Sequence, residues 1–206
     1  MPPQHSGPPR VDQDMEAVAA LERDAQLMLR VREGDETSFA LLLERHRGPV
    51  VNFLHRMVQN RAVAEELAQE CFLRVYRSRE TYEPAAKFTT WLFRIATHLA
   101  LNWIRDSKRE RSNESLNEEL LEGVERQVAD QGRSVEQELV YEVRVREIRE
   151  AIQSLPEKQR AAVLMHKYQG LEYVRIAAAL KCSESAVKSL LFRAYETLRM
   201  RLAHLA

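Results

Sequence analysis

Apolar residues recur along most of the chain with the 3.6-residue period of an α-helix. The clearest case lies near the C-terminus, where five apolar side chains share one helical face: Val187, Leu190, Leu191, Ala194 and Leu198. No stretch alternates apolar and polar residues as a half-buried strand does, and no glycine-rich phosphate-binding motif occurs. The pattern therefore predicts an all-α protein.

Breaks in the apolar pattern predict where the helices begin and end. Helical periodicity runs from near Val18 to Gly34, and Asp35 is placed to cap the next helix. The pair Gly48-Pro49 predicts an interruption, followed by a separate short helix over residues 50–58. Further helices are predicted over residues 62–76, 156–169 and 173–180, from Val135 towards Leu155, and after the caps Thr89 and Ser183.

The last two predicted helices, separated by a tight polar turn, are typical of a helix-turn-helix. The face of the final helix that lies off the apolar stripe carries two cations, a hydroxyl and a ring: Lys188, Ser189, Phe192 and Arg193. Cations suit phosphates and guanine edges, and apolar carbon suits thymine methyl groups. The alternative from the pattern alone is a helical bundle whose last helix has a solvated charged face.

Charge is unevenly distributed in a chain that is neutral as a whole. The 206 residues are 45% hydrophobic and 30% charged, with 31 basic and 31 acidic side chains, as in a soluble globular protein. Residues 87–111 carry a net charge of +4 and residues 181–206 a net charge of +3, whereas residues 113–138 carry −6. Two basic faces joined by an acidic segment are compatible with nucleic-acid binding.

Other candidate chemistries find little support. The two cysteines, Cys71 and Cys182, form no C-x-x-C pair and are interpreted as structural thiols in a reducing cytosol. The six histidines lack metal-ligand spacing, and we expect no metal, cofactor or catalytic residue. No apolar run approaches the ~20 residues that span a bilayer, and the proline-rich start lacks a signal core, so we expect a cytoplasmic protein without membrane insertion.

Two groups of motifs resemble those of one family. Near the C-terminus they are LPEKQR at 155–160, YVRIAA at 173–178, AVKS at 186–189 and FRA at 192–194. Nearer the N-terminus they are AEELAQECFL at 64–73 and FTTWLFRIA at 88–96. These motifs are similar to regions 4 and 2 of the extracytoplasmic-function (ECF) sigma factors, compact members of the bacterial sigma-70 family.

The resemblance covers residues 24–112 and 138–206 and implies two small helical domains. A region 2 bundle is expected over residues 16–112 and a region 4 helix-turn-helix over residues 138–206. A flexible acidic linker over residues 113–137 would join them, and residues 1–15 would form a disordered leader.

The resemblance also implies a function and its residues. Such a protein binds core RNA polymerase, mainly the β′ clamp helices and also β, directs it to promoter DNA and helps to melt the −10 element. The implied polymerase contacts are Glu66, Gln69 and Glu70. The implied −10 contacts are Lys87, Phe88, Arg94, His98, Asn102 and Arg105, with His98 where the family usually has asparagine. The implied −35 contacts are Ser185, Lys188, Ser189, Phe192 and Arg193.

Family habit further implies an anti-sigma factor as a partner. The main alternative is a stand-alone helix-turn-helix regulator, which would need a dimer helix or ligand pocket within residues 24–112. An enzyme is a third hypothesis, with His166 near Glu157 as candidate acid–base groups, but no nucleophile–base pair or carboxylate pair supports it. We therefore expect no covalent chemistry from this chain.

Overall fold

The structure is a computed structural model that describes residues 23–84, 87–113 and 135–205. The predicted leader, residues 1–15, and nearly all of the predicted linker, residues 113–137, lie outside the described residues. Within the described ranges every regular element is a helix, which confirms the all-α prediction.

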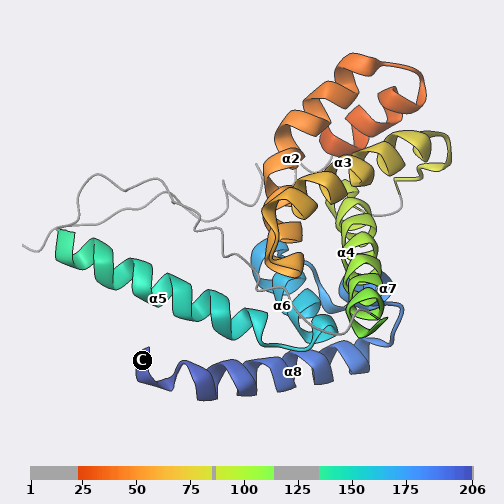
Figure 1. Cartoon of the computed structure of the whole chain (residues 1–206). Coiled ribbons are helices and arrows are strands. Elements are labelled where there is room, and N and C mark those ends of the chain that lie inside the picture. The colour runs from red at the N-terminus through yellow and green to blue at the C-terminus, as the bar shows by residue number, and fades with distance from the viewer. Residues whose placement is uncertain (1–22, 85–86, 114–134, 206) are drawn as a thin grey trace, which may run out of the picture.

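Two groups of helices follow one another along the chain (Figure 1). The first group begins with a helix over residues 23–32 and continues with α2 (Glu36–Val58), α3 (Arg61–Arg77), the 3-10 turn η1 (Arg79–Thr81) and α4 (Phe88–Asn113). The second group contains α5 (Val135–Gln153), α6 (Glu157–Gln169), α7 (Tyr173–Leu180), α8 (Glu184–Arg201) and the 3-10 turn η2 (Ala203–Leu205).

Local capping explains several of these boundaries. The Asp35 carboxylate accepts hydrogen bonds from the backbone N–H groups of Thr37 and Ser38, as predicted for the start of α2. The Ser183 hydroxyl accepts from the N–H of Ala186 at 3.1 Å and so caps α8. Gly170 ends α6 in the left-handed conformation, with φ of 60°, which glycine adopts without a steric penalty.

The predicted interruption at Gly48-Pro49 is wrong, because α2 runs through this pair unbroken. Proline removes one N–H from the helical ladder, but Arg45, whose carbonyl loses that donor, is exposed, so water can satisfy it. The following turn is held by burial of Val50 and Leu54 in the core. Packing therefore outweighs the local helix-breaking signal.

The predicted cap of α4 also differs from the structure. The helix begins at Phe88, one residue before Thr89, and the backbone carbonyl of Lys87 accepts from the N–H of Thr90 at 2.9 Å. Thr89 thus lies inside the first turn rather than at its cap.

The two groups of helices share one continuous apolar core. In the first group Phe53 and Phe93 meet edge to face, with ring centroids 5.3 Å apart. Helix α4 packs against α7, α2 packs against α6, and the Thr97 hydroxyl lies 3.6 Å from the sulfur of Met165. The sequence predicted two units joined by a linker, and it contained no signal for this direct packing.

Polar contacts reinforce the same boundary. The Arg160 guanidinium on α6 donates to the carbonyl of Met57 at the end of α2, at 2.7 Å, and to the carbonyl of Gln153 at 2.6 Å. Arg56 lies over the ring of Tyr168, 4.5 Å from its centroid, and Lys108 pairs with Glu157. These contacts hold α6 against both α2 and α4.

Candidate nucleic-acid interface

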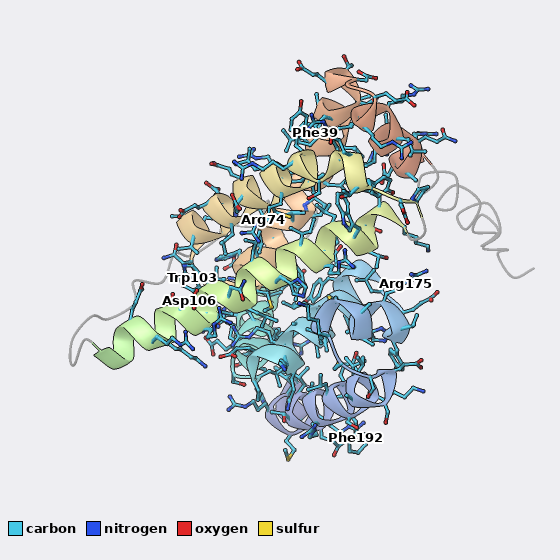
Figure 2. All side chains as sticks on the ribbon, turned by 90° about the vertical axis from the view of Figure 1, so that its right-hand side faces the viewer. Phe39, Arg74, Trp103, Asp106, Arg175 and Phe192 are labelled. Carbon is cyan, nitrogen blue, oxygen red and sulfur yellow. The ribbon has the colours of Figure 1, made fainter. Side chains whose placement is uncertain are left out.

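Helix α8 presents an exposed face that contains every residue predicted for it. The exposed side chains are Ser185, Lys188, Ser189, Phe192 and Arg193. Phe192 is 67% exposed, which is unusual for a ring that size, and it projects from α8 at the edge of the molecule in Figure 2. The opposite face of α8 packs on α6 and α7, so packing fixes which face meets solvent.

Contacts along α8 orient the two cations. The ammonium of Lys188 lies 3.1 Å from the Glu184 carboxylate one turn earlier, and Nε of Arg193 donates to the Ser189 carbonyl at 3.2 Å. An exposed pair of this kind is weak and exchanges readily for a phosphate or base edge. The face therefore combines two cations, hydroxyls and a ring on one rigid helix, which suits a major groove.

A second row of polar side chains runs along α4. Arg94, Asn102 and Arg105 are exposed, His98 is half-buried, and Lys87 is exposed just before the helix. These residues recur on one side of the helix, where they can grip a nucleic-acid backbone and bond to unpaired bases.

Phe88 does not belong to this row, because its side chain is fully buried. Its ring packs against His46, Tyr82 and Trp91, with centroid distances of 5.3, 6.4 and 6.0 Å. A ring in this position cannot touch a base, so the structure contradicts its placement among the −10 contacts. Phe88 instead supports the start of α4 from beneath.

The sequence did not predict a buried polar cluster formed by Asp24, Arg45 and His46, the last of which also contacts Phe88. The Asp24 carboxylate, 5% exposed, pairs with Arg45 and lies 2.9 Å from Nε2 of His46. Burial by itself would raise the pKa of Asp24, but the hydrogen bond and charge of His46 and Arg45 outweigh it and leave that pKa below its usual range. The cluster fastens the helix over residues 23–32 to α2.

The neighbourhood of His98 was not predictable either. Helix α7 packs against α4 here, and the backbone of Ala179 lies within hydrogen-bonding reach of the imidazole. The pKa of His98 is lowered by burial and by the nearby charges of Lys181 and Arg94. Local periodicity carries no information about this contact, because it joins residues about 80 positions apart.

Helix α3 carries a third polar surface. Glu66 and Gln69 are exposed, and the half-buried Glu70 accepts from Nε of Arg74 at 2.7 Å. Leu73, which is 49% exposed, lies on the same side of the helix and adds an apolar side chain to this surface. The opposite side is buried around Cys71, so this surface stands on a rigid base.

A metal site and membrane insertion find no support in the described residues. Among them, no three histidine, cysteine or acidic side chains gather as metal ligands would, and none of the described helices is long and apolar enough to cross a membrane. His166 packs on the ring of Tyr173, with centroids 5.2 Å apart, and its Nδ1 lies 3.3 Å from the Leu171 carbonyl. This geometry fits a packing role for His166.

Within the described residues, a helix with an exposed basic face behind a tight turn, together with a second helix that carries a polar and basic row, is typical of a DNA-binding protein. The family model for sigma-70 region 2 matches residues 42–110, and the model for sigma-70 region 4 matches residues 145–198.

Similar proteins agree over most of the chain. The RNA polymerase sigma-H factor of Pseudomonas aeruginosa is 31% identical over 86% of this chain and 92% of that protein. The ECF RNA polymerase sigma-E factor of Escherichia coli is 32% identical over 85% of this chain and 92% of that protein. The chain therefore belongs to the ECF sigma factors of the sigma-70 family, whose members direct RNA polymerase to promoters.

Solved structures show the same fold. The sigma factor RpoE in complex with the anti-sigma factor NepR from Bartonella quintana is 21% identical, with a TM-score of 0.65 over 80% of this chain and 96% of that chain. CnrH in complex with the cytosolic domain of CnrY is 20% identical, with a TM-score of 0.61 over 89% of this chain and 99% of that chain.

Proposed function

We propose that this sigma factor binds core polymerase with α3 and contacts the −10 and −35 promoter elements with α4 and α8, respectively. The observation that carries the proposal is the pair of exposed polar and basic faces on α4 and α8, each inside a segment that matches the corresponding sigma region. No covalent step is assigned to the chain, because nucleotide polymerisation belongs to its partner.

Helix α8 serves the −35 element. Lys188 and Arg193 supply charge for phosphates or guanine, Ser185 and Ser189 supply hydroxyls, and Phe192 offers apolar carbon to a thymine methyl group. The burial of the opposite face keeps these groups in fixed register with the groove.

Helix α4 serves the −10 element. Lys87, Arg94 and Arg105 bind the backbone of the opened strand, and His98 and Asn102 bond to exposed base edges. Phe88 is left out of the contacts because it is buried. An imidazole at position 98 donates and accepts differently from an amide, so it sets the preferred base.

Helix α3 docks on the polymerase. Acid and amide groups of Glu66, Gln69 and Glu70 meet basic side chains of the β′ clamp helices, and the β subunit is a further contact. Leu73 adds an exposed apolar contact beside them. One similar solved structure contains the anti-sigma factor NepR and another the cytosolic domain of CnrY, which supports an anti-sigma factor as a further cytoplasmic partner of this chain.

Transcription in vitro with core enzyme, this protein and a promoter library tests the proposal. K188A and R193A should each cost about 1–3 kcal/mol of −35 binding, whereas K167A, an exposed lysine on α6, should cost nothing. Unchanged promoter affinity in both α8 variants would contradict the role of α8.

Docking on the polymerase is tested separately by co-elution with purified core enzyme. The double variant Q69A/E70A should elute largely free, while the control E142A on exposed α5 should co-elute as the native chain does. Undiminished co-elution of Q69A/E70A would remove α3 as the docking surface. Failure of the native chain to bind core at all would favour a stand-alone regulator.

A further inference from the structure

A cavity of about 430 Å³ opens where α3, α4 and α7 meet. Arg74 and Ser78 line it from α3 and its end, Trp91, Arg94 and His98 line it from α4, and Lys181 lines it from the end of α7. The cavity therefore draws its walls from both groups of helices and exists only because α7 packs on α4.

The charges around the cavity are not balanced by the protein. No acidic side chain lines it, and within the described ranges only Arg74 has a carboxylate partner, Glu70. Arg94 and Lys181 form no ion pair with any described residue, although both lie close enough to His98 to repel its protonated form. Like charges gathered without a counter-charge create a positive potential that attracts an anion.

The lining also indicates what kind of anion fits. Guanidinium and ammonium groups with a neighbouring hydroxyl are the donors that bind phosphate. Trp91, whose indole packs on the rings of Tyr82 and Phe88 with centroids 5.1 and 6.0 Å away, adds an aromatic wall to the cavity. The volume is within the range of small-molecule sites.

We propose that this cavity binds a small ligand that carries phosphate groups, held by Arg94 from the first group of helices and Lys181 from the second. Because the ligand touches both groups, it stabilises their closed packing. The inference rests on the proposed function in one respect, since Arg94 and His98 also belong to the −10 row.

Because Arg94 and His98 belong both to the cavity and to the −10 row, the ligand would affect binding of −10 DNA. A DNA strand that follows the row on α4 needs the surface of His98, which α7 covers beside Ala179. The strand therefore requires α7 to move away, whereas the free ligand requires α7 to stay. The two are competitors, and by linkage each lowers the affinity for the other.

Binding of inorganic pyrophosphate and of ATP to the full chain, followed by calorimetry and tryptophan fluorescence, tests the proposal. We expect saturable binding that weakens about tenfold in K181A and is unchanged in K167A, the matched lysine outside the cavity. Pyrophosphate should also reduce binding of a single-stranded −10 hexamer to the native chain, and this competition should disappear in K181A.

Absence of saturable pyrophosphate binding, or equal weakening in K181A and K167A, would overturn the proposal, because attraction to the surface in general would then explain the data. The proposal would also be overturned if K181A bound the hexamer more weakly but bound pyrophosphate as the native chain does. Lys181 would then contact DNA and not the proposed ligand. Normal hexamer binding without pyrophosphate binding would reject only this inference, whereas loss of hexamer binding by the native chain would reject the −10 role of α4.

Discussion

At the scale of single residues, burial separates side chains that the sequence treats alike. Phe88 and Phe192 both belong to family motifs and both were assigned to DNA. Phe88 is fully buried, whereas Phe192 is 67% exposed. A buried ring contributes to stability through packing, and an exposed ring remains available to a partner.

Replacing each ring by alanine should give opposite results. F88A should lower the free energy of unfolding by about 3–5 kcal/mol, because it leaves a cavity beneath α4. F192A should hardly change stability but should weaken −35 binding. Urea denaturation and promoter binding measure the two effects, and a stable F88A variant with selectively lost −10 binding would contradict the burial argument.

The two cysteines should differ in reactivity. Burial raises the pKa of Cys71 to about 12, so its thiolate is almost absent at neutral pH, and Cys182 is only half-buried. A thiol reagent should modify one cysteine in the native chain and the second only after unfolding. Counting modified thiols in the native chain and in C182S checks this, and rapid labelling of native C182S would exclude a closed site at Cys71.

Asp24 should make stability depend on acidity. The pKa of Asp24 is lower in the folded chain than in the unfolded chain. Its contribution to the free energy of unfolding is therefore fully present above the pKa of the unfolded chain, and it is lost as the pH falls through the pKa of the folded chain. D24N should therefore lose about 2 kcal/mol near pH 7, and the difference from the native chain should shrink in acid.

Chemical denaturation from pH 7 to pH 3 measures that difference. The control D106N changes an exposed aspartate and should leave the stability curve unaltered. A difference between native chain and D24N that stays constant down to pH 3 would mean that Asp24 is not held as a carboxylate.

At the scale of helices, local signals and packing compete. The Ser183 hydroxyl satisfies the N–H of Ala186 and starts the helix that carries the −35 face. At Pro49 the local signal loses, because the buried residues on both sides of the pair hold α2 together. A cap at an exposed helix end has no such support from packing and should matter more.

Removal of the α8 cap tests this. S183A should lower stability by about 1 kcal/mol and weaken −35 binding, since the first turn of α8 frays beneath Ser185 and Lys188. S183D should restore both, because aspartate is an equally good cap and favours the positive end of the helix dipole. Denaturation and promoter binding report the result, and equal damage by S183A and S183D would point to a role other than capping.

At the scale of the whole molecule, the region 2 and region 4 units expected from the sequence are both present, and they pack directly on each other. Packing of α7 on α4 lowers the pKa of His98, because it buries the imidazole and places Lys181 near it in addition to Arg94. Because protonated His98 would be repelled by Lys181 and Arg94, the closed packing should weaken as the pH falls from the ordinary imidazole pKa of 6.5 through the lowered pKa of His98.

Small-angle scattering between pH 8 and pH 5 should show this change. The radius of gyration of the native chain should rise as the pH falls. In H98N, which replaces the imidazole by an amide that carries no charge at either pH, the rise should be absent. An equal rise in H98N would show that His98 does not control the packing.

The sequence by itself determined the helices, their apolar faces and the family. The stripe through Val187, Leu191 and Ala194 is buried as predicted, and Asp35, Gly170 and Ser183 mark helix ends as predicted. These features depend on neighbours within one or two turns, so they can be recognised in the order of residues alone. The exposed residues of α8 follow directly, because they lie off the buried stripe.

Only the tertiary structure decided what lies next to what. The burial of Phe88, the cluster around Asp24, the cover of α7 over His98 and the bond from Arg160 to Met57 all join segments that are distant in sequence. Such contacts form when distant segments pack together, and the pattern of one segment alone does not specify which segment packs on it. The motifs therefore predicted the candidate interfaces, and the fold determined which of their residues can be reached.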